Sequence, residues 1–502
     1  MRCPRLQTPE QGSLPSFMGF TRAIVYWNLT KTVGFKNDSL TTRFSCRCRE
    51  KGRGHDSLKS FIIIGAGASG IILAAQLLRR SPDSTVRIFE RSGQLGAGIA
   101  YATENPSHLL NVRASNMSAY PDQPNHFLNW LQLSDIAAPG HLWEPHSFAP
   151  RKLYRSYLKH LMAPYLSDDD TRLKVEKTGV VDVALKDGRP AVTTETGDTF
   201  TADAVIVSTG NEAAIAKSGN HVTEYWSSNG YFDVPTDAPV AIFGTGLSMI
   251  DSVLSLLDNG HRAEIYAISR RGLLPAVHAP AQAFPVEVDD LPVSLGLSKL
   301  MQRVRVMMAE AEKTGSGWRG VMDGLRPHPQ HIWAILPTSQ RRSFLRHLRP
   351  WWDVHRHRMA PAVAERIEAA VNSGQLKVAA GHLVSVRDQG EEIEVRYRPR
   401  RSEHVEELQV STVIDCRGGN PRFSTTRNAA LIGLMEHGLA RPDPLDLGFD
   451  VTRDQQILNK RGEPSGPFFG IGPVTKGAFW EVTAVPDIRV QAERLSAILL
   501  EG

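Results

Sequence analysis

Cysteine is scarce in this sequence, which has four cysteines among 502 residues. Cys3, Cys46, Cys48 and Cys416 form neither a C-x-x-C nor a C-x4-C pair, so a redox-active dithiol is not expected. A secretory signal is also disfavoured, because no continuous apolar segment follows the first arginines. So few cysteines suggest a reducing compartment, and we predict a cytoplasmic protein.

The sequence also lacks a strong excess of positive or negative charge. The formal net charge of +5 is small for this length, and lysines and arginines are spread along the chain apart from one cluster at residues 341–358. Nucleic-acid binding requires a concentrated basic face, so no nucleic-acid partner is expected. The content of 41% hydrophobic and 22% charged residues is typical of a soluble globular protein, and the length allows two or three domains.

Residues 1–57 lack any sustained alternation or helical periodicity, and they are rich in arginine and poor in acidic residues. A transit peptide would share this bias, but no amphipathic helix is evident. We predict a disordered or poorly structured leader, or an upstream start of the chain.

One stretch, Phe61–Leu78, has no charged side chain over 18 residues, as a membrane span would. However, a spanning helix needs about 20 apolar residues with a helix-compatible interior, and here Gly65, Gly67 and Gly70 interrupt the run as G-x-G-x-x-G. The pattern instead predicts a buried parallel strand, a glycine turn and a helix. Such a turn lets the backbone approach a pyrophosphate at the helix N-terminus, and no membrane span is expected.

The next strand ends in an acid, as a dinucleotide site requires. Val86–Phe89 is short and apolar, and Glu90 follows it, 25 positions after Gly65. An acid at this place accepts hydrogen bonds from the ribose hydroxyls of the adenosine.

The chain then repeats this plan. Val240–Leu257 has the same strand, glycine turn and helix, with Gly244 and Gly246 in the first two glycine positions and Met249 in the third. A predicted hairpin and a returning strand follow both copies. We therefore predict an α/β fold with two Rossmann-like dinucleotide-binding domains, the second of which holds a helical insert.

The two units differ at the residue that selects the ligand. The second strand of the second unit ends in Ser269, Arg270 and Arg271 instead of an acid. Guanidinium groups suit a 2′-phosphate, so we predict FAD in the first unit and NADPH, or NADH, in the second. A solvated strand end is the alternative for the two arginines.

The C-terminal segment is expected to return to the first unit and to end in a helix at residues 486–500. Its N-terminus would face the flavin and stabilise negative charge there; the alternative is an ordinary amphipathic helix.

The predicted parts are a leader at 1–57, the FAD domain at 58–235, the NAD(P) domain at 236–420 with its insert at 275–370, and the rest of the FAD domain at 421–502.

Six motifs together resemble the bacterial FAD- and NAD(P)-binding flavoproteins of the two-dinucleotide-domain type: IIIGAGASG, GAGIAYAT, HLLNVRASNMS, IFGTGLSMID, WWDVHRHRMAP and WEVTAVPDIRVQ. Members that the chain resembles include FAD-dependent urate hydroxylases, which use NAD(P)H and O2 to hydroxylate a purine. The resemblance implies flavin contacts from Gly96–Tyr101 and from Asn111, Arg113, Ser115 and Asn116. The Gly-Asp pair that contacts the ribitol in this group is absent, since no acid accompanies Gly470 or Gly472.

The arginine cluster of the insert offers a substrate pocket. Six arginines, three histidines and two tryptophans occur between residues 341 and 358, and stacking and ion pairing would suit a planar or anionic molecule. Trp352, His355 and Arg356 are the predicted substrate contacts. The alternative is a structural helix pair whose arginines bridge the domains or contact NADPH. A metal at His355 and His357 is disfavoured, because no carboxylate or cysteine stands at ligand spacing.

We therefore predict an FAD-dependent NAD(P)H oxidoreductase, a monooxygenase that uses O2 and hydroxylates a small polar or aromatic molecule. An NAD(P)H-dependent reductase that passes electrons to a quinone or protein, and a non-catalytic flavin-binding redox sensor, stay open. No catalytic residue or oligomeric state is assigned. The predicted cofactor-binding residues are Gly65, Gly67, Ser69, Gly70, Glu90, Arg91, Gly98, Asn111, Gly210, Gly244, Gly246, Ser248, Arg270, Arg271, Val485 and Asp487.

Overall fold

The computed structural model describes residues 59–501 apart from 138–140, 213–221, 226–232 and 420–421. The predicted leader and three of the four cysteines lie outside the described residues. None of the helices described is both long and apolar enough to cross a bilayer.

The first sheet has six strands in the order β15-β16-β7-β1-β2-β3, parallel except for the antiparallel pair β15-β16. The strands from residues 456–470 lie beside those from residues 59–207, so the C-terminal part of the chain does return to the first sheet. A small antiparallel sheet, β4-β5-β6, is separate. The strands are β1 (Lys59–Ile64), β2 (Ser84–Phe89), β3 (Leu173–Glu176), β4 (Val180–Lys186), β5 (Arg189–Thr194), β6 (Thr199–Thr201), β7 (Ala204–Val207), β15 (Gln456–Leu458) and β16 (Pro464–Gly470).

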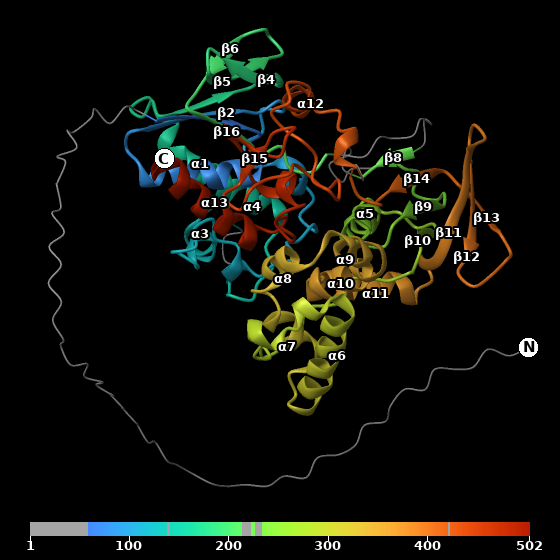
Figure 1. Ribbon diagram of the computed structural model, residues 1–502. Helices are drawn as coiled ribbons and strands as arrows, with labels where there is room; N and C mark the ends of the chain where they lie inside the picture. The colour runs from blue at the N-terminus through green and yellow to red at the C-terminus, as the bar shows by residue number, and fades with distance from the viewer. Residues whose placement is uncertain (1–58, 138–140, 213–221, 226–232, 420–421, 502) are drawn as a thin grey trace, which may run out of the picture. The chain divides into compact units, whose positions relative to one another are not determined.

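Helix α1 (Ala68–Arg80) explains the uncharged run of the sequence. Every residue from Ser69 to Leu78 is buried, because α1 packs against both the sheet and the C-terminal helix α13 (Val485–Glu501), which lie side by side in Figure 1. The other helices of this unit are α2 (Gly98–Tyr101), α3 (His126–Leu133), α4 (Arg151–Met162) and α12 (Ala429–Glu436).

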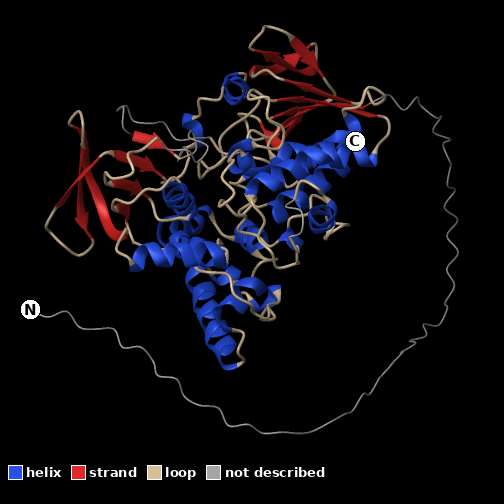
Figure 2. Ribbon diagram, turned by 180° about the vertical axis from the view of Figure 1, so that it is seen from behind, coloured by secondary structure: helices blue, strands red, loops and turns tan. Residues whose placement is uncertain are grey.

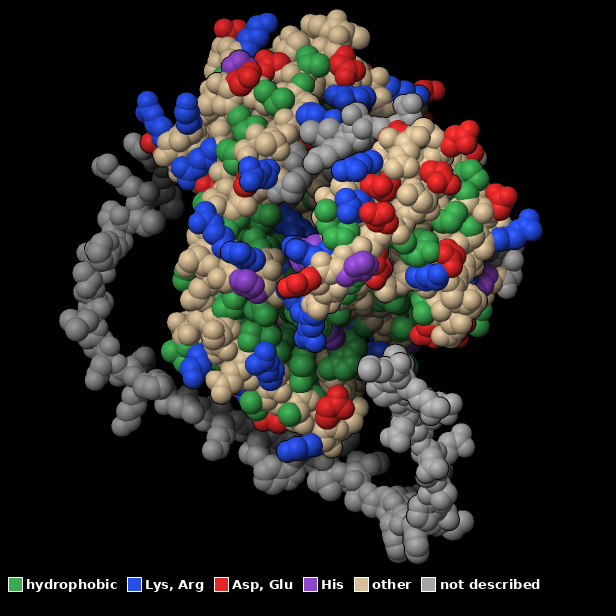
Figure 3. All heavy atoms as spheres, turned by 90° about the vertical axis from the view of Figure 1, so that its right-hand side faces the viewer, with side chains coloured by type: hydrophobic (Ala, Val, Ile, Leu, Met, Phe, Trp, Pro, Cys, Tyr) green, Lys and Arg blue, Asp and Glu red, His purple; other side chains and the backbone are tan. Residues whose placement is uncertain are grey.

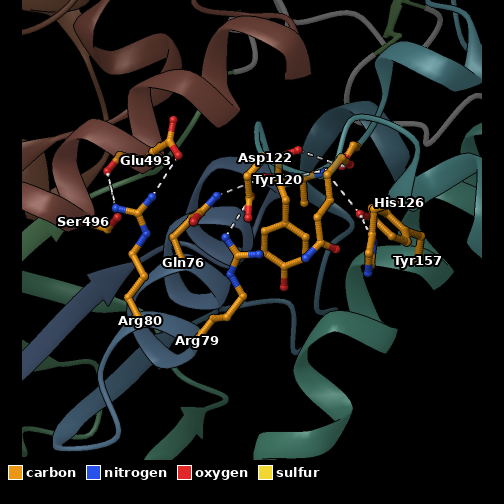
Figure 4. A network of polar contacts seen from close by, with 12 residues as sticks. Gln76, Arg79, Arg80, Tyr120, Asp122, His126, Tyr157, Glu493 and Ser496 are labelled. Atoms are coloured by element: carbon orange, nitrogen blue, oxygen red, sulfur yellow. Dashed lines mark hydrogen bonds and ion pairs between the residues drawn. The ribbon is translucent and has the colours of Figure 1, made fainter.

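The polar end of α1 is held by ion pairs to two distant segments (Figure 4). Arg80 pairs with Glu493 of α13 at 2.9 Å, and Arg79 pairs with Asp122 at 2.9 Å. The Arg79 guanidinium also lies 4.2 Å from the ring centroid of Tyr120. The last turn of α1 therefore connects the C-terminal helix to the loop before α3.

The second sheet has seven strands in the order β13-β12-β11-β10-β9-β14-β8, and Figure 2 shows its strands apart from those of the first sheet, with helices between. The predicted repeat of strand, turn and helix is confirmed by β9 and α5 (Leu247–Asp258). Strand β8 belongs to this sheet although it precedes the predicted boundary at residue 235. The strands are β8 (Val222–Glu224), β9 (Val240–Phe243), β10 (Ile265–Ser269), β11 (Leu376–Asp388), β12 (Ile393–Pro399), β13 (Glu406–Val410) and β14 (Thr412–Asp415).

The helical insert lies between β10 and β11 and extends away from the second sheet (Figure 1). It has its own small core, which includes Val304, Met307 and Val321. Helix α11 (Pro361–Asn372) falls within the predicted insert, yet it packs into the core of the second unit beside α5 and β11. The insert helices are α6 (Leu297–Lys313), α7 (Gly317–Gly324), α8 (Pro329–Ile335), α9 (Thr338–Ser343), the π-helix η5 (Phe344–Leu348) and α10 (Arg349–Arg356).

A buried polar contact joins the two dinucleotide units. Arg151 of α4 pairs with Asp251 of α5 at 2.8 Å, and these side chains are 15% and 6% exposed. The imidazole Nε2 of His108 lies 2.9 Å from the backbone oxygen of Asp251 and 2.9 Å from the Ser255 hydroxyl. Because a carbonyl oxygen only accepts, Nε2 carries the proton; burial lowers the pKa of His108, which keeps the ring neutral.

Replacing Asp251 with alanine should lower the free energy of unfolding by about 3 kcal/mol, because Arg151 is then left buried without its carboxylate partner. Denaturant titration followed by circular dichroism measures the change. The exposed pair Arg494–Asp454 supplies the control: Asp454→Ala should cost less than about 1 kcal/mol. Equal losses in the two variants would show that burial adds nothing to the Arg151–Asp251 pair.

Candidate functional site

A cavity of about 660 Å³ receives residues from both dinucleotide units, and we call it the shared cavity. Its volume is that of an ordinary cofactor pocket. The first unit contributes the turn after β1, the end of β2, helix α2, the turn after β7 and the segment that leads into α13; the second contributes the first turn of α5. Among its lining residues are Gly65, Gly67, Ser69, Glu90, Gly98, Asn111, Gly210, Ser248 and Val485, all predicted cofactor contacts.

The three glycines of the first turn have different roles. Gly65 has φ +105°, and a Cβ there would lie 2.7 Å from the Ser208 carbonyl oxygen; a Cβ at Gly70 would lie 2.1 Å from the Gly65 carbonyl oxygen. These two glycines are required by the fold. The nearest atom to a Cβ at Gly67 is instead the Gly98 Cα, at 3.6 Å, so Gly67 and Gly98 face each other where they line the cavity.

Helix α1 begins at Ala68 without a capping side chain. The first N–H groups of a helix have no partner within it, and together with the helix dipole they favour an anion. An uncapped helix N-terminus at an open glycine turn is the arrangement that a pyrophosphate needs, so these residues fit FAD.

Glu90 directly follows strand β2, as the sequence pattern predicts, and its side chain lines the shared cavity. One carboxylate oxygen accepts from the Ala66 N–H at 3.0 Å, and the other accepts from the Ser92 N–H at 2.9 Å and its hydroxyl at 2.8 Å. Glu90 therefore holds the glycine turn, and its remaining lone pairs leave the predicted ribose contact possible. Arg91 points elsewhere, with its Nε 3.1 Å from Glu195 Oε1 in an exposed pair.

The second glycine turn repeats the geometry of the first. Gly244 has φ +109°, and a Cβ there would lie 2.7 Å from the Cys416 carbonyl oxygen. Gly246 precedes α5, which also begins without a capping side chain. Arg270 is exposed, whereas Arg271 donates to the His347 carbonyl oxygen at 3.2 Å and so contacts the insert.

The predicted arginine-rich pocket is not assembled as one site. Trp352 and His355 line a different, apolar cavity in the insert. Arg356 is buried, with its Nε 3.2 Å from Glu481 Oε2, and Arg358 pairs with Asp323 at 3.0 Å. Arg356 and Arg342 thus contact residues outside the insert, whereas the partner of Arg358 lies within it. In the part of the chain that the structure describes, no group of three or more potential metal ligands comes together.

The sequence did not point to two side chains of the shared cavity: Lys476, in the segment before α13, and His357, directly after α10. Lys476 and His357 line the shared cavity, and burial lowers the pKa of both side chains. His357 Nε2 lies 3.8 Å from Glu481 Oε1. Burial opposes ionisation of Glu481, but His357 and Arg356 hold the pKa of this carboxyl below its usual value.

Arg151 and Asp251 also line the shared cavity and were not predicted. Asp251 had a signal in the sequence, because it is a lone carboxylate within the otherwise uncharged stretch Val240–Leu257. An acid on a buried apolar helix needs a partner, although the sequence does not say which one.

Replacing Gly67 with valine should abolish FAD binding and leave the fold intact, because its Cβ would meet the Gly98 Cα at an ordinary contact distance of 3.6 Å while the branched side chain fills the cavity wall. Visible flavin absorbance and the circular dichroism spectrum of the purified variant measure the two effects. Gly70→Ala is the contrasting control, since its Cβ collides with the turn itself and should reduce the yield of folded protein. A yellow Gly67→Val protein would contradict this assignment of the FAD site.

Asp487, in the first turn of α13, should make stability depend on pH. Burial, assisted by the negative charge of Glu481, raises the pKa of Asp487 to about 6. The positive charges of Arg356, Arg326 and Arg489 act in the opposite direction and only partly offset this rise. The folded state therefore binds a proton that the unfolded state has released, and as pH rises from about 4 through 6 the native protein loses up to about 3 kcal/mol.

The Asp487→Asn variant removes this dependence, so it should gain stability over the parent protein as pH rises from 4.5 to 7.5. Unfolding free energies at both pH values measure the gain. Glu493→Gln on the same helix controls for the loss of a carboxylate, and a difference for Asp487→Asn that is the same at both pH values would contradict the pKa assignment.

Comparison with known proteins agrees with this geometry. Residues 62–212 match the model of a family described as FAD-NAD(P)-binding. The protein YdhS of Escherichia coli (strain K12), itself uncharacterized, is 24% identical over 311 residues, which are 52% of this chain and 56% of that protein. The matched region thus spans little more than half of that relative.

Solved structures of flavin hydroxylases share the fold. The ornithine hydroxylase of Pseudomonas aeruginosa gives a TM-score of 0.60 at 16% identity over 88% of this chain and 99% of its own. The Kutzneria ornithine N-hydroxylase gives 0.61 at 16% identity, covering 88% and 98%, and the Pseudomonas syringae L-lysine 6-monooxygenase gives 0.59 at 15% identity, also covering 88% and 98%. The chain thus contains an FAD-NAD(P)-binding domain, and its α/β fold is the one that these three structures share.

Proposed function

We propose that the protein is an FAD-dependent NAD(P)H oxidoreductase that acts as an O2-dependent monooxygenase on a small molecule. The observation that carries this proposal is the shared cavity, to which the first glycine turn and the first turn of α5 both contribute. Two nucleotides bound at these turns would bring their reactive rings into one enclosed space, as hydride transfer requires.

The residues of the shared cavity supply binding, orientation and exclusion of water. The N–H groups at the start of α1 would hold the pyrophosphate, Glu90 the ribose, and Ser248 at the start of α5 the nicotinamide nucleotide. Bound FAD would supply the chemistry of hydride acceptance and O2 activation. The N-terminus of α13, at Val485, adds positive potential that favours negative charge in the cavity.

His357 is the group that can hold or move a proton in this cavity. Its pKa is lowered by burial, so the ring is neutral near pH 7, and Nε2 lies 3.8 Å from Glu481 Oε1. A neutral imidazole can accept a proton from a reacting group, and because its pKa is lowered it readily passes that proton on.

The substrate is proposed from likeness alone. The resemblance to urate hydroxylases makes urate or a similar purine the first candidate, and the ornithine and lysine hydroxylases that share the fold add ornithine and lysine. The rival is a reductase that passes electrons to a quinone or protein from the same cofactor sites, and it needs no closed substrate pocket.

NADPH oxidation by the purified flavin-loaded protein, with O2 uptake and peroxide release recorded together, tests the proposal. With the right substrate, oxidation should accelerate while little peroxide forms; NADH is compared under the same conditions. Gly67→Val provides the flavin-free control. A requirement for an added electron acceptor, with no response to any small substrate, would replace the monooxygenase by the reductase.

A further inference from the structure

Lys476 brings a positive charge to the shared cavity. It directly follows the short helix η7 (Gly472–Thr475) and lines the cavity. Its ammonium nitrogen lies 5.0 Å from the ring centroid of Trp480, but within the described part of the chain it has neither an ion pair nor a hydrogen bond. An ammonium group held away from bulk water without a counter-ion is costly, so this side chain favours an anion in the cavity.

The nitrogen atoms of Lys476 and His357 are accessible. Among the neighbouring charged groups, Arg356 Nε, Glu481 Oε2 and Asp487 Oδ2 are fully enclosed by protein. By contrast, the Lys476 nitrogen and the two ring nitrogens of His357 are not enclosed. Lys476 is half-buried, and the side chain of His357 is 28% exposed. A ligand in the shared cavity can therefore reach these two bases, whereas the charged groups around them are closed off.

Lys476 and His357 are near enough to interact electrostatically. Burial is the main cause that lowers the pKa of His357, and the positive charges of Arg356 and Lys476 lower it further. The carboxylate of Glu481 acts in the opposite direction on both His357 and Lys476. Since such effects weaken with distance, the two bases lie close together, at the part of the cavity that the segment before α13 forms.

Positive charge exceeds negative charge around these two bases. The charged groups that act on one another here are the cations Lys476, Arg356, Arg326 and Arg489 and the carboxylates Glu481 and Asp487. Asp353 does not supply the missing negative charge, because it pairs with Arg349 at 3.2 Å. Figure 3 shows lysine, arginine and histidine side chains gathered around a hollow at the centre of one face of the molecule. An anion bound beside Lys476 would reduce this imbalance.

The phosphates of the two predicted nucleotides have other binding groups in the shared cavity. The uncapped N-termini of α1 and α5 offer them unpaired N–H groups and a favourable dipole. Lys476 belongs instead to the segment that leads to Val485, at the start of α13, where the sequence predicts the flavin ring. The anion that suits Lys476 is therefore expected on a third molecule.

We propose that Lys476 binds the anionic group of the substrate, a small organic anion such as a carboxylate, and holds it beside His357. The anion site stands on the contacts and charges of Lys476. Its role as a substrate site narrows the function proposed above to small organic anions and rests on that function. Benzoate is the model ligand, because it combines one carboxylate with a flat ring.

Titration of the flavin-loaded protein with benzoate, without NADPH, tests the site by calorimetry and by the change in the visible flavin spectrum. Benzamide, which has the same number of non-hydrogen atoms but no charge, is the matched ligand. Because the attraction depends on the negative charge, benzamide should bind about tenfold more weakly or less. Equal binding of the two ligands would overturn the anion site.

Lys476→Met removes the charge and keeps a long side chain, so it should weaken benzoate binding about tenfold or more and leave benzamide binding unchanged. Lys476→Arg keeps the charge and should largely restore benzoate binding. Lys460→Met removes a lysine that is exposed and outside the lining of the cavity, and it should bind benzoate as the parent protein does. Should Lys476→Met fold poorly by circular dichroism, Lys476→Gln replaces it.

The flavin content and the NADP+ affinity of Lys476→Met distinguish a substrate anion from a cofactor phosphate. Both should equal those of the parent protein. Loss of flavin, or weaker NADP+ binding with unchanged benzoate binding, would assign Lys476 to a cofactor and overturn the inference.

The two proposals fail separately. Coupled NADPH oxidation with an uncharged substrate, at the same rate in Lys476→Met and in the parent protein, would overturn the inference and support the proposed function. Benzoate binding that depends on Lys476, combined with NADPH oxidation that responds to no small substrate and requires an added electron acceptor, would support the anion site and overturn the monooxygenase.

Discussion

The buried ion pair between Arg151 and Asp251 is the constraint on which the shared cavity depends. The two glycine turns belong to different sheets. The uncapped N-termini of α1 and α5 can line one cavity only if α5 is held against the first unit. Coulomb attraction in a low-dielectric contact is strong but costs desolvation of both ions, so the pair fixes one arrangement of the units instead of merely adding stability. The neutral ring of His108, bonded to the backbone of Asp251 and to Ser255, restricts rotation of α5 as well.

The segment from Lys476 to Val485 is the second place where the structure is tightly determined. Glu481 has φ +73°, a left-handed conformation that costs a non-glycine residue of order 1 kcal/mol or more. Its carboxylate accepts from Trp352 and lies beside Arg356, and these contacts hold the strained backbone. The same side chain therefore connects the segment before α13 to Trp352, Arg356 and His357 of the insert.

Local sequence sufficed for the glycine turns, for Glu90 and for the last helix, because each depends on neighbours within a few residues and on a plan that the chain repeats. It failed for the arginine cluster. Residues close together in sequence between 341 and 358 are dispersed by three successive helical segments, one of them the π-helix η5, so Arg342 reaches Pro444 while Arg358 reaches Asp323. The partner of Asp251 stands 100 positions earlier in the chain, and no local pattern could identify it.

The contrast between the two cavities limits what the chemistry can be. The shared cavity is lined by glycine turns, helix ends, Arg151, Asp251, His357 and Lys476, which suit phosphates, ribose and a reacting centre. The apolar cavity of the insert, which Trp352 and His355 line, offers aromatic and aliphatic surface instead. Trp352 donates to Glu481 Oε1 at 2.8 Å, and His357 Nε2 lies 3.8 Å from the same oxygen. One carboxylate therefore lies between a residue that lines the apolar cavity of the insert and a residue that lines the shared cavity.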